Sequence, residues 1–146
     1  MARRSMIVLT LAAAACDNPA SPTDDLEDAR RTWRRQAIQN YSFTVHQDCF
    51  CPEDVRGPFR VRVASGVIVS VTDPVTGAPR GASAFVPLTV EALFDRVQQA
   101  IDDGMDELDV RYDSTLGYPV VIEINLSQQA VDAGIVIRVS DLTVHQ

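Results

Sequence analysis

The sequence predicts an α+β domain in which two amphipathic helices pack on one face of an antiparallel sheet of about six strands, in the order αβββαβββ. Two segments repeat apolar residues every three or four positions, which is the period of a helix. Six shorter segments alternate apolar with polar residues, which is the period of a half-buried strand. The length of 146 residues and the hydrophobic share of 46% support a single compact domain.

The first helix is expected over residues 24–40, where apolar residues recur at helical spacing. These residues are Leu26, Ala29, Trp33 and Ala37. Acidic residues lead the segment and arginines follow, an order that suits the helix dipole. Asp24 and Glu27 have the spacing of a capping box, and Glu27 can form an ion pair with Arg31 one turn later. We therefore expect this helix to begin at Asp24.

Three strands are then expected over residues 41–47, 59–63 and 67–71. The last two form a hairpin whose register depends on the length of its loop. A two-residue loop would place Arg62 opposite Val69. A three-residue loop, with Gly66 in the left-handed conformation, would pair Val61 with Val69 and let valines face valines. We predict the three-residue loop.

The second half repeats the pattern after a long loop over residues 73–87, which prolines and glycines interrupt. A second helix is expected after the cap residue Thr89, with Gly104 as its stop signal. Its buried stripe consists of Leu93, Phe94, Val97, Ala100 and Ile101. Three further strands are expected over residues 108–112, 118–124 and 135–142.

The turn between the first two of these strands has its own signature. Asp113 should cap the turn through its side chain, and Gly117 should supply a positive φ shortly before Pro119. Each half of the chain also ends in a similar strand that is followed within a few residues by an aspartate, Asp73 or Asp141. This similarity predicts a degenerate duplication.

The first residues have the layout of a secretory signal. Arg3 and Arg4 precede a run of ten weakly polar to apolar residues, which is too short to span a bilayer because a spanning helix needs roughly 20. The alanines directly before Cys16 resemble the lipobox of bacterial lipoproteins, although Ala13 stands where that motif usually has leucine. An ordinary secretory signal is the alternative, and both interpretations predict export.

The lipobox resemblance implies a division of the chain into three parts. Residues 1–15 would be the signal peptide, and Cys16 would become the first mature residue and carry the lipid, including palmitate. Residues 16–23 would form a short polar tether, and residues 24–146 a single α+β domain. The expected location is the bacterial cell envelope, on either its inner or its outer membrane, with the lipid as the membrane anchor.

The charge balance limits the possible partners. Thirteen basic and twenty acidic residues give a net charge of −7, which disfavours nucleic acid. We expect a monomer without a cofactor, whose partner is an envelope protein or peptidoglycan. The sequence contains no G-x-S-x-G, no H-E-x-x-H and no glycine-rich phosphate loop, so it predicts no catalytic site.

The segment Cys49-Phe50-Cys51-Pro52 is the most specific motif. Together with the turn Tyr112-Asp113-Ser114-Thr115-Leu116-Gly117-Tyr118-Pro119, it resembles a family of uncharacterised bacterial lipoproteins with a CFCP segment and a YDxxxGYP turn. The expected architecture also looks like that of PepSY domains and the beta-lactamase inhibitor protein, which are binding modules. These resemblances imply a lipoprotein that binds a partner and does not catalyse a reaction.

With Cys16 lipidated, Cys49 and Cys51 are left in an oxidising compartment, so we predict that they form a disulfide. Residues two apart in a strand lie about 6.5 to 7 Å apart, and the backbone must therefore bend at Phe50. We interpret the pair as a static clip. One alternative is a redox pair assisted by His46, because so small a disulfide ring should be strained and easily reduced. The other is a metal site of His46, Cys49 and Cys51.

Four arginines on the predicted strands form a second candidate site: Arg60, Arg62, Arg111 and Arg138. If they share the open face of the sheet, they could bind an anionic partner, although neighbouring acidic residues favour a solvated face. The sequence thus predicts a non-catalytic, lipid-anchored envelope module. The alternative is a thiol-redox or metal-handling lipoprotein that acts through Cys49 and Cys51.

Overall fold

The computed structural model describes residues 21–82, 85–105, 107–125 and 134–146, and it has the predicted α+β fold. Its helices are α1 (Pro22–Arg35), α2 (Glu53–Arg56) and α3 (Val90–Asp102). Its strands are β1 (Tyr41–Asp48), β2 (Phe59–Ala64), β3 (Val67–Thr72), β4 (Glu107–Tyr112), β5 (Pro119–Asn125) and β6 (Gly134–Val144). The predicted signal and Cys16 lie outside the described residues. Among the described residues, no helix is long and apolar enough to cross a membrane.

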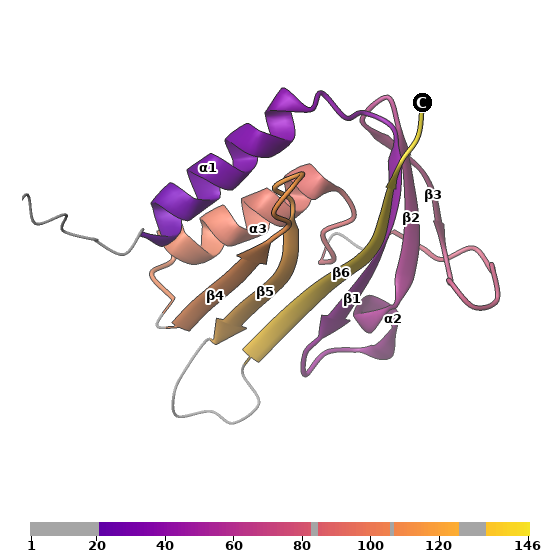
Figure 1. The fold of residues 1–146 in the computed structure, drawn as a ribbon. Coiled ribbons are helices and arrows are strands. Elements are labelled where there is room, and N and C mark those ends of the chain that lie inside the picture. The colour runs from indigo at the N-terminus through magenta and orange to yellow at the C-terminus, as the bar shows by residue number, and fades with distance from the viewer. Residues whose placement is uncertain (1–20, 83–84, 106, 126–133) are drawn as a thin grey trace, which may run out of the picture.

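The six strands form one antiparallel sheet in the order β3-β2-β1-β6-β5-β4. Helices α1 and α3 lie side by side and cover one face of this sheet (Figure 1). The central pair, β1 and β6, joins the first half of the chain to the second. Each half presents its three strands in the same spatial order, and the predicted duplication stays a prediction.

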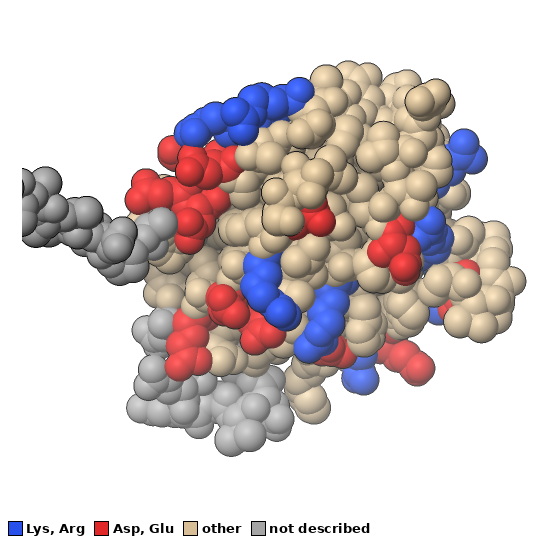
Figure 2. All heavy atoms as spheres, viewed as in Figure 1, with Lys and Arg blue, Asp and Glu red and all other residues tan. Residues whose placement is uncertain are grey.

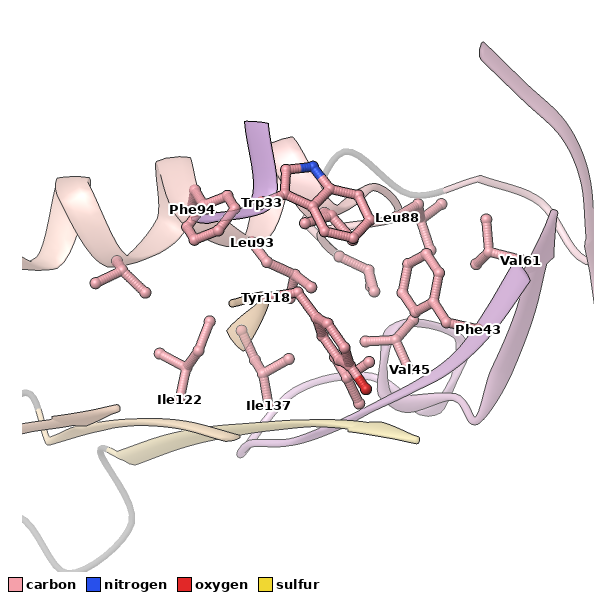
Figure 3. Packing of buried hydrophobic residues seen from close by; sticks show 14 of the residues in the cluster. Trp33, Phe43, Val45, Val61, Leu88, Leu93, Phe94, Tyr118, Ile122 and Ile137 are labelled. Atoms are coloured by element: carbon pink, nitrogen blue, oxygen red, sulfur yellow. The ribbon is translucent and has the colours of Figure 1, made fainter. Parts of the chain in front are cut away.

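The core fills the space between the two helices and the sheet. Aromatic and branched side chains from β1 and β2 meet Trp33 of α1 and Leu93 and Phe94 of α3 (Figure 3). The largest fully buried side chains include Tyr41, Phe43 and Phe59. Their alternation along β1 and β2 leaves polar residues on the opposite, open face of the sheet.

A hydrogen-bond network fastens both helices to β1. Glu91, at the start of α3, accepts hydrogen bonds from Trp33 Nε1 at 3.1 Å and from the Tyr41 hydroxyl at 3.2 Å. The Tyr41 oxygen accepts a hydrogen bond from Val90 N at 3.1 Å. Burial raises the pKa of Tyr41 well above its ordinary value. The hydrogen bond from Val90 opposes this rise, and the Glu91 carboxylate adds to it.

Helix α1 begins earlier and ends earlier than predicted. Ser21 is the cap residue, and it forms the capping box with Asp24, so the prediction of a start at Asp24 with a box to Glu27 was wrong. The Ser21 hydroxyl accepts the hydrogen bond from Asp24 N at 3.2 Å, and the proline that follows suits the first helical position. Arg31 pairs with Asp28 at 2.8 Å and not with Glu27.

The helix ends at Arg35 because the chain enters the left-handed region two residues later. Ala37 has a φ of 50° and is exposed, so it does not belong to the buried stripe, contrary to the prediction. Leu26, Ala29 and Trp33 are buried as predicted. Helix α3 begins after the cap Thr89 and is followed by Gly104 with a φ of 63°, as predicted, while Ile101 is only half-buried.

The predicted hairpin register was wrong. Two residues, Ser65 and Gly66, form the loop with φ values of 50° and 74°, which is the geometry of a tight primed turn. The register shifts between Arg62 and Val63, so Val61 pairs with Val71 and not with Val69. A β-bulge at Val69 absorbs the extra residue and keeps Val71 on the core face. Gly66 is left-handed, as expected.

The two aspartate turns have the same design. Asp113 Oδ1 accepts hydrogen bonds from the backbone N–H groups of the second and third residues after it, at 3.0 and 2.7 Å, and Gly117 has a φ of 83°, as predicted. Asp73 Oδ1 does the same at 2.9 Å for both bonds, and Gly77 has a φ of 70°. These bonds lower the pKa of the Asp73 carboxyl. The long loop predicted over residues 73–87 therefore begins with an ordered turn.

Candidate functional site

A groove with a volume of about 1100 Å³ lies at the end of β1. It runs between the loop 49–52, α2, residues 85–87, the outer side of α3 and the first residues of β6. Most of its lining is apolar and consists of Phe50, Pro52, Val55, Phe85, Val86, Pro87, Ala92 and Ile135 together with both cysteines. Polar side chains contribute Gln47, Asp54, Asp95, Arg96 and Gln99. Several segments that are far apart in sequence thus build one concave surface.

Cys49 and Cys51 form a disulfide on the wall of this groove. Their Cα atoms are 5.2 Å apart, so the chain bends between them as the sequence required. The bend turns Phe50 outward, and 89% of this residue is exposed. Both cysteines are only partly buried. The pair is therefore a disulfide that borders a surface groove.

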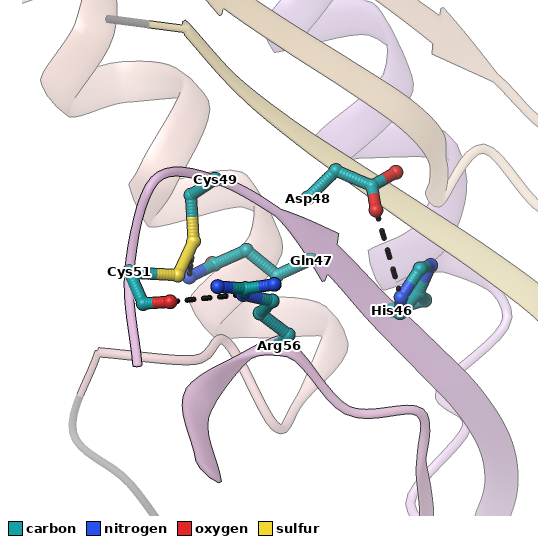
Figure 4. The surroundings of a disulfide bond; sticks show 6 residues. All are labelled: His46, Gln47, Asp48, Cys49, Cys51 and Arg56. Carbon is teal, nitrogen blue, oxygen red and sulfur yellow. Dashed lines mark hydrogen bonds and ion pairs between the residues drawn. A yellow bond between two sulfur atoms is a disulfide. The ribbon is translucent and has the colours of Figure 1, made fainter. Parts of the chain in front are cut away.

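Two side chains hold the disulfide loop in place (Figure 4). Gln47 donates a hydrogen bond from Nε2 to Cys49 Sγ at 3.5 Å, although only 5% of this glutamine is exposed. Arg56, the last residue of α2, donates from Nε to the Cys51 carbonyl oxygen at 2.9 Å. The short helix α2, which the sequence analysis did not predict, thus has a role in positioning the loop.

Sequence reasoning missed Gln47, although a signal was present. Tyr41, Phe43 and Val45 point into the core, and Gln47 continues this alternation as a polar residue at a core position. A buried amide normally has a specific partner, and the cysteine two residues later was the nearest polarisable acceptor.

His46 does not approach the cysteines. It lies on the open face, where its Nε2 atom is 3.6 Å from Asp48 Oδ1 (Figure 4). Asp48 also contacts Arg138. Within the described part of the chain, no group of three or more histidines, cysteines and acidic residues is arranged to hold a metal ion. The geometry therefore gives no support to a metal site of His46, Cys49 and Cys51.

The four predicted arginines share the open face, because each alternates with core residues along its strand. Arg60 donates to Ser42 Oγ at 2.9 Å and to the Asp141 carbonyl at 3.2 Å, so it stabilises the irregular pairing of β1 with β6. Arg138 is paired with an acidic residue. Acidic and basic side chains are interspersed over β4, β5 and β6 (Figure 2). Because Arg138 is paired with an acidic residue and Arg60 is hydrogen-bonded within the sheet, this face is a weak candidate for binding an anion.

The comparisons with known proteins support the resemblance to an uncharacterised family. A model described as a family of unknown function (DUF6174) matches residues 25–144. The chain belongs to this family. The matched span contains both the CFCP segment and the YDxxxGYP turn, whereas Cys16 precedes it. The family has no described function, and no curated protein and no solved structure matches the chain.

Proposed function

We propose that this member of the family is an exported, lipid-anchored and non-enzymatic module that binds an apolar segment of an envelope protein in the groove at the end of β1. The observation that carries this proposal is the groove itself, whose lining is mostly apolar and whose wall includes the exposed Phe50. Concave apolar surfaces with a few polar groups are the usual binding sites of proteins.

The chemistry of the groove favours a protein segment with basic residues. The lining contains the carboxylates of Asp54 and Asp95 and the guanidinium of Arg96. Arg30 of α1 pairs with Asp95 at 3.3 Å, so the acidic excess comes from the chain as a whole, which has a net charge of −7. Complementary charge speeds association and selects partners, so basic flanks should favour the apolar segment. Peptidoglycan, which is rich in polar sugars, fits such a lining less well.

A binding experiment tests the groove. The probe is a fluorescein-labelled peptide of alternating leucine and phenylalanine, flanked by arginines. It should bind the purified domain, and the fluorescence anisotropy of the peptide should then rise. Phe50→Ala should weaken this binding at least tenfold, because exposed aromatic residues often dominate an interface. Val75→Ala is the matched control, since Val75 is 90% exposed and lies outside the groove lining. No binding by the unchanged domain, or equal loss in both variants, would contradict the proposal.

The lipid anchor is tested separately. Cells that produce the full chain and grow with an alkyne-labelled palmitate should incorporate the label into the protein, and Cys16→Ala should abolish incorporation. The lipobox-like alanines before Cys16 support this expectation, as do the polar residues of the sequence between Cys16 and Pro22. A labelled Cys16→Ala protein, or an unlabelled natural sequence, would refute the anchor and leave the groove proposal intact.

The position of the disulfide supports a second candidate function, thiol–disulfide exchange with a partner held in the groove. Both cysteines line the groove and remain partly exposed, so a thiol on a bound segment could reach them. The double change Cys49→Ser with Cys51→Ser separates the two functions. Peptide binding should survive it if the pair is a static clip, whereas any exchange with a partner thiol must be lost.

A further inference from the structure

We infer that a partner thiolate attacks the sulfur of Cys51, and that Cys49 leaves as a thiolate stabilised by Gln47. This inference rests on the second candidate function, and it assigns different roles to the two sulfurs. It follows from the hydrogen bonds and burial around the disulfide.

The surroundings of the two sulfur atoms differ. Cys49 Sγ accepts the hydrogen bond from Gln47 Nε2, whose side chain comes from a buried position at the end of β1. No described residue donates a hydrogen bond to the sulfur of Cys51. Arg56 donates to the carbonyl oxygen of Cys51, which holds the backbone of the loop. Among the described residues, a negative charge that forms during reduction therefore meets a direct hydrogen-bond donor on Cys49 alone, whereas the Arg56 cation acts on a Cys51 thiolate only through space.

An amide N–H that touches a neutral sulfur forms a weak hydrogen bond, and the same bond strengthens when the sulfur becomes a thiolate. Stabilisation of the charged form lowers the pKa of the thiol. In thiol–disulfide exchange, the sulfur with the lower pKa leaves faster. Gln47 is thus a positioning residue that directs bond breakage toward Cys49.

The reaction balances without a further reagent if the partner supplies two thiols. The first partner thiolate forms a bond to Cys51 Sγ, and the bond between Cys51 and Cys49 breaks to release the Cys49 thiolate. The second partner thiolate then attacks the partner's own sulfur in this mixed disulfide and releases the Cys51 thiolate. The partner leaves with a disulfide, and the protein is left with two thiols. The substrate class is an exported protein with two cysteines near an apolar segment.

Two single-cysteine variants test the assignment of the sulfurs. In Cys51→Ser, only Cys49 remains of the pair, and in Cys49→Ser only Cys51 remains. The pKa of each remaining thiol is measured from the ultraviolet absorbance of its thiolate, in protein without the N-terminal signal and Cys16. We expect the pKa of Cys49 to be about one unit below that of Cys51, which is the effect of one hydrogen bond to a charged group. Equal values, or a lower pKa for Cys51, would overturn the inference.

A second measurement uses reduced glutathione as the probe on the natural disulfide. After quenching with an alkylating agent, fragment mass spectrometry should find glutathione on Cys51 and the alkyl group on Cys49. Gln47→Met should slow reduction about threefold to tenfold, because it keeps the side-chain volume and removes the donor. Gln98→Met is the matched control, since Gln98 lies on α3 outside the groove lining and donates a hydrogen bond to Asp102 at 3.0 Å.

The outcomes separate the inference from the function on which it rests. If neither glutathione nor a dithiol reduces the natural disulfide of the folded protein, thiol exchange itself is refuted. If reduction proceeds but glutathione is found on Cys49, or if both methionine variants behave alike, thiol exchange stands and the roles assigned here are wrong. Should Gln47→Met fail to fold, the comparison of the two single-cysteine variants decides the question.

Discussion

The hydroxyl group of Tyr41 should contribute measurably to the stability of the fold. The residue is 1% exposed, and its oxygen accepts a hydrogen bond from Val90 N, the first residue of α3. The same hydroxyl donates to Glu91. Tyr41→Phe removes both interactions and leaves the ring in place. Because Val90 is fully buried, its N–H group would lose its partner without gaining water in exchange.

The size of the effect can be worked from these contacts. An unsatisfied buried donor costs about 1 to 3 kcal/mol of stability. The lost bond to Glu91 adds only about 1 kcal/mol, because the exposed carboxylate can form hydrogen bonds to water instead. The free energy of unfolding should therefore fall by about 3 kcal/mol. For a chain of this size, the melting temperature should fall by about 10 °C.

Urea denaturation of the purified domain measures this change, and Tyr112→Phe is the matched control. Tyr112 is half-buried, and burial raises its pKa to about 12. Its hydroxyl makes no hydrogen bond to any described residue, so its removal should change the free energy of unfolding by less than about 0.5 kcal/mol. If the two variants lose the same stability, the network of Tyr41, Val90 and Glu91 does not fasten α3 to the sheet.

Three further predictions concern pH, backbone geometry and the disulfide. The domain should lose stability above about pH 10, where the unfolded chain releases tyrosine protons that the folded chain retains. Tyr41→Phe should weaken this dependence in denaturation curves at several pH values. Gly117→Ala should destabilise the fold by more than about 2 kcal/mol in thermal melts, because φ is 83° and the new Cβ would lie 2.6 Å from a carbonyl oxygen of α1. Gly81→Ala is the control and should leave the stability unchanged, because its new Cβ meets nothing within 4 Å. Replacing both Cys49 and Cys51 by serine should lower the free energy of unfolding by only about 1.5 kcal/mol, since the ring is so small, and a loss above about 4 kcal/mol would contradict this reasoning.

The period of the apolar residues was enough to predict both long helices and all six strands. It failed where one residue is added without changing the pattern. The bulge at Val69 is such a case. Apolar and polar residues alternate regularly on each side of it, and the prediction chose the loop length that pairs valine with valine across the hairpin. The early start of α1 was missed for a related reason, since the pattern of apolar residues begins at Leu26 and the capping box lies ahead of it. Cap chemistry at Ser21 and Pro22 would have corrected this boundary.

The candidate site was only partly predictable. The CFCP segment was recognisable as the most specific motif, and its bend at Phe50 followed from chain geometry. The groove was not, because its walls include residues 85–87 and the start of β6, which only the tertiary fold brings to the cysteines. The four-residue helix α2 was also missed, since a single turn has no period to detect.

The site lies where the central strand leaves the sheet, and this position bears on its function. Pairing of β1 with β2 ends at Val45, whereas pairing with β6 continues to Asp48. The residues directly before the disulfide are therefore held by one neighbouring strand, and the free side of this segment is filled by the loop that contains α2. Cys49 is hydrogen-bonded to Gln47, which is paired with the central strand β6, while Cys51 is held by Arg56 of the loop. A partner thiol that joins Cys51 would act on the loop and leave the pairing of β1 with β6 intact, and this favours the thiol exchange proposed for the groove.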